Sequence, residues 1–237
     1  MPVNRFYLDD PLEEGTTVAL EGAEQHHAAK VVRCTEGDTV ELVNGRGCLA
    51  QGLVRDVQRR TLGIEVTSSS VEVPPEKKII LLQAFPRKNR LDTIVEKATE
   101  LGADALYLFP AALSERSFTS HDRVVQGAVS AMKQCGRLFL PEVYCGDTLP
   151  EILEVLAAAT IYYGSFAEGA PPFHQRWKEP EGDVAFVIGP ESGLTEQEEE
   201  LLQKSGAEGV SLHPWILRTD TAAIGAMMLI KYWRHYQ

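Results

Sequence analysis

Three short segments in the C-terminal half of the chain combine glycine or proline with polar residues, and each follows an apolar run. They are Tyr163-Gly164-Ser165, residues 189–193 and residues 213–221. Glycine lets the backbone approach a ligand closely, and proline fixes its path. If the apolar runs are parallel strands, these turns leave the carboxyl edge of one sheet, where such sheets bind ligands. Backbone amides and carbonyls in these turns suit an adenine edge or ribose hydroxyls, although each turn taken alone is more typical of a plain strand-to-helix connection.

The elements that must position these turns begin near residue 78, where strand and helix patterns alternate. Residues 79–84 form a continuous apolar run, as expected for a strand buried on both faces. Thr195 and Glu198 form a capping box at the start of one helix. The alternation predicts an α/β fold with a mostly parallel sheet covered on both faces. We expect further strands at 105–109, 160–163, 184–188 and 209–212, and helices at 91–101, 121–134, 149–158, 195–205 and from 219 or 220 to 233.

The first 73 residues have a different pattern, of short strands separated by turns. Strands are expected at 16–20, 39–43, 48–57 and 62–66, with Asn44-Gly45 as a tight turn and one helix at about 23–33. This pattern predicts a small β-barrel with one helix. Pro74 and Pro75 remove two backbone donors and stiffen the chain. We therefore place the domain boundary there and expect domains at 1–73 and 74–237.

Two motifs in this first part suggest ligands but are better explained by structure. Residues 45–50 fit the loose dinucleotide pattern G-x-G-x-x-A, yet a strand follows them instead of the helix that would hold a pyrophosphate. His26 and His27 are adjacent, and adjacent side chains on a helix point about 100° apart, so they do not converge on one ion. The four cysteines form no C-x-x-C pair. No metal is expected.

Composition limits the class of protein. The chain has 237 residues, 44% of them hydrophobic and 24% charged, which suits a globular protein. Residues 1–10 are polar and charged, so we expect no secretory signal there, and the apolar run at 222–230 is too short to span a bilayer. We expect a cytoplasmic protein without a membrane partner. The net charge of −11 argues against non-specific coating of nucleic acid, but residues 74–140 hold ten Lys and Arg against seven Asp and Glu.

An ordered set of short motifs resembles the RsmE family of 16S ribosomal RNA uridine-N3 methyltransferases, in the SPOUT superfamily. Near the N-terminus, Arg5-Phe6-Tyr7 and His26-His27 with Val32-Arg33 resemble its PUA-like domain. The motifs of the second part are residues 85–92, 96–102, 114–117, 134–137, 188–191 and 216–219, in the family's order. The resemblance covers nearly the whole chain.

This resemblance implies a SPOUT-type domain with a trefoil knot after a PUA-like β-barrel, a homodimer, and S-adenosylmethionine bound in the knot loops. The substrate that it implies is 16S rRNA or the small ribosomal subunit. The residues that it assigns to the cofactor are Tyr163, Gly164, Ile188, Gly189, Pro190, Glu191, Gly193, Leu212, His213, Ile216, Leu217, Thr221 and Ala222.

Within this interpretation Arg218 is the candidate catalytic residue. Uracil N3 must lose its proton to attack the methyl group, and a cation at a helix N-terminus would stabilise the negative charge that develops on the uracil oxygens. A structural clamp on Glu191 or on loop carbonyls explains Arg218 equally well. N3 lies on the pairing edge, so the base must be unpaired or flipped out. The proposed phosphate contacts are Arg5, Arg33, Lys88, Arg90, Arg116 and Arg137, each of which also suits a solvated surface.

Five positions depart from the family pattern, namely Lys133, Ser192, His213, Trp215 and Asp220. Ser192 and His213 add side chains beside the expected cofactor loops. Two alternatives therefore stay open. One is a SPOUT methyltransferase for another RNA site, and the other is a non-catalytic RNA-binding or ribosome-assembly protein with the same fold.

Overall fold

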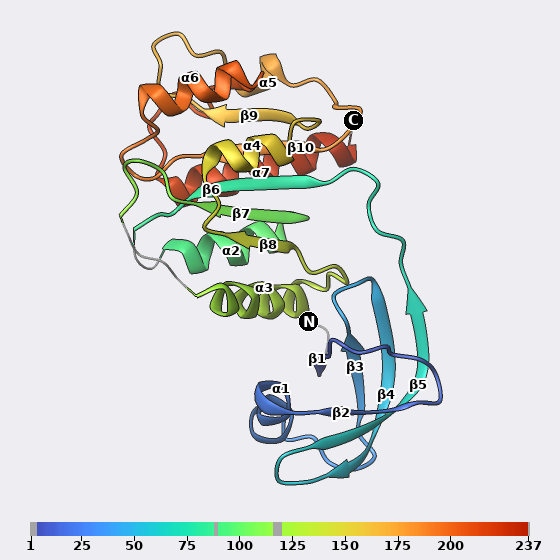
Figure 1. Cartoon of the computed structure of the whole chain (residues 1–237). Coiled ribbons are helices and arrows are strands. Elements are labelled where there is room, and N and C mark those ends of the chain that lie inside the picture. Colours follow the sequence, from blue (N-terminus) through green and yellow to red (C-terminus); the bar gives the residue numbers. More distant parts are fainter. Residues whose placement is uncertain (1–3, 88–89, 116–119, 237) are drawn as a thin grey trace. The chain divides into compact units, whose positions relative to one another are not determined.

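The computed structural model describes residues 4–87, 90–115 and 120–236, with the side chain of the last residue excepted (Figure 1). The chain separates into two compact units. The first comprises Met1–Pro75 and Val129–Leu140, and the second comprises Glu76–Ala128 and Pro141–Gln237. The segment 129–140 thus belongs to the first unit, whereas the division expected from the sequence assigns it to the second domain.

The first unit is built on a five-stranded sheet of order β1-β3-β4-β5-β2. β1 pairs with β3 in parallel, and the other ladders are antiparallel. Alternate side chains of the strands, such as Val40, Leu42 and Ile64, are fully buried in one core. The strands are β1 (Arg5–Tyr7), β2 (Thr17–Leu20), β3 (Thr39–Val43), β4 (Cys48–Val57) and β5 (Leu62–Val71).

The single helix expected at 23–33 is divided. A short α1 (Gly22–His26) continues as the π-helical η1 (His27–Val32), which ends at Arg33 in the left-handed conformation, with φ of 63°. The His27 ring packs edge-on against Phe6, with ring centroids 5.6 Å apart, while His26 is exposed. The two histidines therefore face different surroundings. Lys133, one of the unusual positions, lies 2.5 Å from the Glu24 carboxylate of α1.

The second unit contains a six-stranded sheet of order β11-β9-β10-β6-β7-β8 in which every neighbouring pair is parallel. β6, β7 and β10 are buried along their whole length, which explains why they read as unbroken apolar runs. This sheet confirms the expected α/β class. The strands are β6 (Ile79–Ala84), β7 (Ala105–Phe109), β8 (Glu142–Cys145), β9 (Thr160–Gly164), β10 (Val184–Ile188) and β11 (Glu208–Val210).

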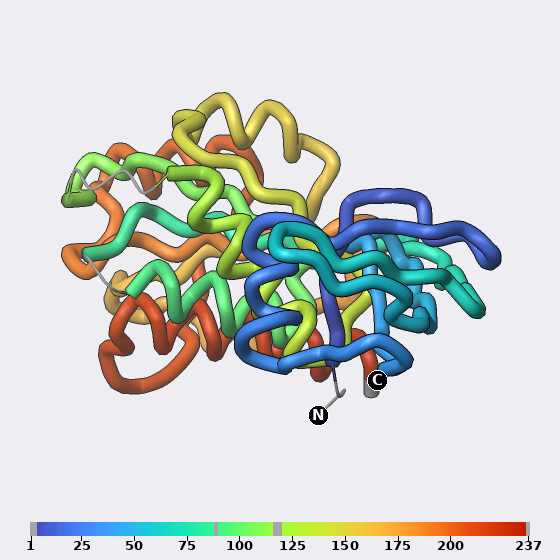
Figure 2. Tube along the Cα trace, turned by 90° about the horizontal axis from the view of Figure 1, so that it is seen from below, coloured from blue at the N-terminus to red at the C-terminus, as the bar shows by residue number. Residues whose placement is uncertain are grey.

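Helices cover both faces of this sheet, with α2 and α7 together on one face and α4 on the other (Figure 2). On the face of α7, Phe173 of α5 packs its ring against Phe186 and Trp233 at centroid distances of 5.1 and 5.0 Å. None of the described helices is both long and apolar enough to cross a membrane. The helices that contribute to the second unit are α2 (Arg90–Glu100), α3 (His121–Cys135), α4 (Leu149–Val155), α5 (Phe173–Arg176), α6 (Glu196–Lys204) and α7 (Thr219–Tyr236). From Val129 on, α3 belongs to the first unit.

Candidate functional site

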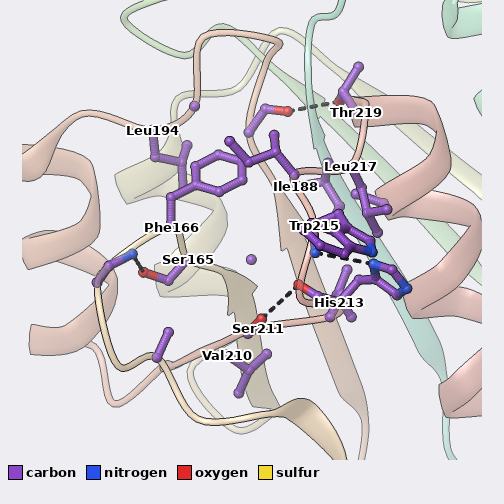
Figure 3. Close-up of a pocket in the computed structure, with 18 of the residues that line it drawn as sticks. Ser165, Phe166, Ile188, Leu194, Val210, Ser211, His213, Trp215, Leu217 and Thr219 are labelled. Carbon is purple, nitrogen blue, oxygen red and sulfur yellow. Dashed lines mark hydrogen bonds between the residues drawn. The ribbon is translucent and has the colours of Figure 1, made fainter.

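The turns that follow β9, β10 and β11 line one cavity of about 460 Å³ (Figure 3). These three strands are neighbours in the sheet, and because they are parallel their carboxyl ends lie at the same edge. The volume falls within the range of about 300–1,000 Å³ that is usual for small-molecule sites. The three segments singled out by their glycines and prolines therefore surround a single space.

Most of the residues expected to contact a cofactor line this cavity. Two do not. Tyr163 is buried in the core, where its hydroxyl accepts a hydrogen bond from Nε2 of Gln203 at 2.9 Å, and Thr221 is exposed on α7 outside the described lining. The eleven that do are Gly164, Ile188, Gly189, Pro190, Glu191, Gly193, Leu212, His213, Ile216, Leu217 and Ala222.

Other lining residues were not among the expected cofactor contacts, although Ser165, Pro214, Trp215 and Thr219 lie within the segments that the sequence singled out. Several belong to the loop between β9 and α5, where Gly169, Pro171 and Pro172 predict a turn but do not predict that the loop lines the cavity. Others are close neighbours of expected residues, and only the folded turn brings them to the cavity wall. The additional residues are Ser165, Phe166, Ala167, Gly169, Ala170, Leu194, Val210, Ser211, Pro214, Trp215 and Thr219.

A buried hydrogen-bond chain ties the turn after β10 to the start of α7. The hydroxyl of Thr219 donates to the carbonyl oxygen of Gly189 at 2.8 Å and accepts from Nε2 of Gln83 at 3.0 Å. The Gln83 side chain is fully buried at the end of β6, and its Nε2 also donates to the carbonyl oxygen of Ala84 at 2.8 Å. Since buried polar groups are costly to leave unpaired, this chain restricts the position of the cavity wall.

Arg90 forms a second tie around the cavity. Its Nε lies 3.1 Å from Oε1 of Glu191, and its Nη1 donates to Oδ1 of Asp220 at 2.8 Å. The Glu191 carboxylate also accepts from the backbone N–H of Arg87 at 3.1 Å. Arg90 was expected to contact phosphate, but the structure places its guanidinium between two carboxylates. Asp220, which departs from the family pattern, still supplies one of them.

Arg218 lines the cavity and is exposed. Its side chain forms no ion pair or hydrogen bond with any residue of the described ranges. Glu191, the partner that a structural clamp would use, is held by Arg90. The positive charge of Arg218 is therefore available at the edge of the cavity.

The unusual side chains near the turns leave the cavity open. His213 directs its ring back to its own turn, where Nδ1 accepts a hydrogen bond from the backbone N–H of Trp215 at 3.2 Å. The hydroxyl of Ser211 donates to the carbonyl oxygen of His213 at 3.1 Å. Ser192 is exposed and lies outside the set of described residues that form the wall. Neither departure from the family pattern fills the site.

One acidic side chain lies beneath the turn after β9. The hydroxyl of Ser165, a lining residue, donates to Oε2 of Glu199 at 3.3 Å. Burial raises the pKa of Glu199, and the hydrogen bond from Ser165 partly offsets that rise. The turn is thus coupled to the protonation state of a carboxyl group in α6.

The proposed phosphate contacts have different surroundings. Arg5 is paired with Glu41 at 2.8 Å, and its side chain is only 9% exposed. Arg33 is exposed, and Arg137 is half-buried with an interaction partner of its own. Lys88 and Arg116 lie outside the described residues. Among the described residues, no three His, Cys, Asp or Glu side chains are arranged to hold a metal ion.

Comparison with known proteins identifies the family. A family model described as an RNA methyltransferase domain matches residues 73–231, and an RNA methyltransferase PUA domain matches residues 20–67. The chain is 29% identical to the ribosomal RNA small subunit methyltransferase E of Bacillus subtilis (strain 168), over 97% of this chain and 96% of that protein. It is 31% identical to the protein of the same name from Mycobacterium bovis (strain ATCC BAA-935 / AF2122/97), over 94% and 88%.

A solved structure agrees with these relatives. The ribosomal RNA small subunit methyltransferase E of Neisseria gonorrhoeae, crystallised with S-adenosyl methionine, matches with a TM-score of 0.86 and 27% identity, over 98% of each chain. The fold and the sequence therefore lead to the same conclusion: this chain belongs to the RNA methyltransferase family that includes the ribosomal RNA small subunit methyltransferases E, with a PUA-like domain before the α/β domain.

Proposed function

We propose that this protein methylates N3 of a uridine in 16S ribosomal RNA and takes the methyl group from S-adenosylmethionine. The observation that carries the proposal is that three strand-exit turns form one cavity, with Arg218 at its edge, and that the Arg218 guanidinium pairs with no residue of the described ranges. Relatives named for small-subunit ribosomal RNA methylation, which match almost end to end, support the same substrate. A ribosomal substrate implies a cytoplasmic protein.

The walls of the cavity fit S-adenosylmethionine. Backbone groups of the turns at Gly164, Gly189 and Leu212 are the expected partners of the adenosine part, and the apolar side chains of Ile188 and Leu217 suit its uncharged surfaces. When bound, the cofactor supplies a methyl group on a sulfonium ion. The chain's own contribution is to hold the reactants in line and to exclude water.

Arg218 is the residue to which we assign the stabilisation of charge. Negative charge moves onto the uracil oxygens as N3 loses its proton, and the guanidinium of Arg218 would interact with that charge most strongly at the transition state. Arg218 directly precedes α7, so the N-terminal end of that helix adds a favourable field. The hydrogen bonds of Thr219 and the ion pairs of Arg90 would keep the segment around Arg218 in place for the reaction.

The protein must also bind the phosphate backbone of the RNA. We propose Arg33, which is exposed, together with Lys88 and Arg116, as phosphate contacts. Arg5, Arg90 and Arg137 are weaker candidates, because Arg5 and Arg90 already pair with carboxylates and Arg137 has its own partner. Phosphate contacts fix the register of the RNA, while the cavity selects the base.

We further propose that the protein acts as a homodimer. Met228 and Tyr232 are large side chains that α7 leaves exposed. Exposed apolar side chains on one helix favour association. Static light scattering tests this directly. A dimer gives twice the 26.2 kDa mass of one chain, and a single-chain mass at micromolar concentration would contradict the proposal.

The decisive experiment is a methylation assay. Small ribosomal subunits from a strain lacking this modification are incubated with the protein and S-adenosylmethionine, and the RNA is digested and mapped by mass spectrometry. We expect one new 3-methyluridine in 16S RNA. Methylation at another position or in another RNA would favour the related SPOUT activity. RNA binding without methylation, and without heat of cofactor binding by calorimetry, would favour the non-catalytic alternative.

A further inference from the structure

Three large apolar side chains at the cavity are exposed to solvent. Phe166 is 64% exposed, Trp215 75% and Ile216 84%, and all three line the same space. Phe166 comes from the loop after β9, and Trp215 comes from the turn after β11 (Figure 3). Ile216 follows Trp215 in the same turn. Grouped apolar exposure of this kind marks a binding surface more often than a chance arrangement.

Of the two aromatic rings, Phe166 is already in contact with a neighbouring turn. A β-carbon placed on Gly193 would lie 3.4 Å from Cε2 of Phe166, so the Phe166 ring rests against the turn after β10. Trp215 is the more exposed of the two. Its indole therefore offers the larger free aromatic surface at the cavity.

The backbone that carries Trp215 is held in place. Its N–H donates to Nδ1 of His213 at 3.2 Å, and Ser211 holds the carbonyl oxygen of His213 at 3.1 Å. Nδ1 can accept only while the His213 ring is neutral. Pro214, between the two, further restricts the segment. An exposed ring on a restrained backbone loses less entropy on binding than one on a free loop.

The same segment also carries Arg218, whose guanidinium has no partner in the part of the chain that the structure describes. Arg218 follows Trp215 by three residues, and both line the cavity. An apolar partner protein on this surface would bury Arg218 without a counter-charge, which is costly. An unpaired pyrimidine satisfies both side chains, because it has a flat face for the indole and carbonyl oxygens for the guanidinium.

We propose that Trp215 is the stacking surface for the unpaired target nucleobase and so determines substrate affinity. This inference rests on the proposed function. A base that leaves its stack in RNA loses a few kcal/mol of stacking, and an aromatic side chain recovers part of that loss. Ring stacking tolerates any base, so Trp215 would set affinity for an unpaired base while other groups select uracil.

The first experiment tests whether the aromatic ring of Trp215, and not merely its apolar volume, is needed for substrate affinity. Trp215→Phe keeps a ring, and Trp215→Leu keeps apolar volume without one. For Trp215→Leu we expect kcat/KM on small ribosomal subunits to fall by about 5- to 150-fold, with an unchanged Kd for S-adenosylmethionine, while Trp215→Phe retains most of the activity. Val155→Ala removes an exposed apolar side chain from α4, outside the cavity, and should have no effect. Equal losses in both Trp215 variants, or a parallel loss of cofactor affinity, would overturn the proposal.

The second experiment requires no methyl transfer. The chain has three tryptophans, and the other two, Trp177 and Trp233, pack against Phe173. A single-stranded, uridine-containing oligoribonucleotide should quench the fluorescence of the wild-type protein and quench Trp215→Phe much less. A fully paired duplex of the same sequence should quench neither. Quenching that persists in Trp215→Phe, or that the duplex reproduces, would reject stacking on Trp215. Quenching by the single strand, together with no methylation of small ribosomal subunits in the assay above, would reject the proposed function and keep the stacking surface.

Discussion

The hydroxyl oxygen of Thr219 lies 2.8 Å from the carbonyl oxygen of Gly189 and joins the first residue of α7 to the turn after β10. The same hydroxyl accepts from the buried amide of Gln83, so one side chain connects α7 to two strand ends of the sheet. The wall of the cavity thus depends on a hydroxyl group that has no chemical part in methyl transfer.

Thr219→Val should therefore destabilise both the fold and the cofactor site. The variant keeps the shape of the side chain but leaves the Gln83 amide and the Gly189 carbonyl without this partner. We expect a loss of about 1–3 kcal/mol in the free energy of unfolding, measured by urea denaturation, and weaker S-adenosylmethionine binding by calorimetry. Thr219→Ser keeps the hydroxyl and should stay close to wild type. If both variants behave alike, the hydroxyl is not what holds the turn.

Substitutions of Arg90 and of Arg33 should affect the salt dependence of RNA binding differently. Each phosphate contact that is removed lowers the salt slope of RNA binding by about one. Arg33→Gln should show this reduction. Arg90→Gln should leave the slope unchanged and instead weaken cofactor binding, because Arg90 holds Glu191 and Asp220. These carboxylates are partly exposed, so the effect on unfolding should be no more than about 1 kcal/mol. A reduced slope for Arg90→Gln would place that side chain on the RNA.

Arg218→Ala should affect the chemical step. Removing one group that stabilises charge at a transition state typically lowers kcat by about 10²- to 10³-fold. Single-turnover methylation of small subunits measures this step, and calorimetry should show an unchanged Kd for the cofactor. Arg218→Lys keeps the charge and should recover part of the rate. If the affinity for the cofactor fell by the same factor as the methylation rate, Arg218 would be a structural clamp and not a catalytic residue.

Gly47→Ala should destabilise the first unit without affecting cofactor binding. Gly47 has φ of +90°, and a β-carbon there would lie 2.5 Å from Cζ of Phe139 and 2.7 Å from the carbonyl oxygen of Glu72. Strain and overpacking each cost about 1–3 kcal/mol. Gly37→Ala is the matched control, since Gly37 has φ of +91° but open space around it. Thermal unfolding should show a clearly larger loss for Gly47→Ala than for Gly37→Ala, and equal losses would exclude the packing contribution.

Glu199→Gln should change stability in a pH-dependent way. Burial raises the folded-state pKa of Glu199, so the folded protein binds this proton more tightly than the unfolded chain does. Stability contributed by this group is therefore present at low pH and falls as pH rises through the raised pKa. The stability of Glu199→Gln relative to wild type should increase as the pH rises above the ordinary pKa of a glutamate side chain, about 4.3. Glu196→Gln, exposed in the same first turn of α6, should show no such increase.

The elements that were predictable from the sequence are those whose burial leaves a regular pattern. β6 and β10 have the expected bounds because both their faces are covered, and α6 begins at the expected capping box. β1, β8 and α5 have three or four residues each and no periodicity to detect. β5 continues to Val71 through exposed polar residues, because its backbone pairs with β4.

The residues of the site likewise include some that the sequence predicts and some that it does not. Glycine and proline marked the three turns, because backbone geometry at a turn is a local property. The loop after Ser165 also contains Gly169, Pro171 and Pro172, but nothing in its sequence indicates that Phe166 reaches the cavity, which it does only in the folded chain. Arg90 could not be assigned from sequence either, since its partner Asp220 lies 130 positions away. Local composition predicts where a turn occurs, but it does not predict which distant charges meet there.

The membership of residues 129–140 in the first compact unit has a practical consequence for dissecting the protein. The backbone N–H of Gly47 donates to the carbonyl oxygen of Leu138, and that of Leu140 donates to the carbonyl oxygen of Gly45. Met132 and Leu138 complete an apolar cluster with Val43. Two stretches of the gene, interrupted by more than fifty codons, therefore encode one folded body. A single crossover near codon 75 between the genes of two relatives would combine residues 1–75 of one protein with residues 129–140 of the other. The contacts between these two stretches would then be mismatched, so both stretches must be exchanged together.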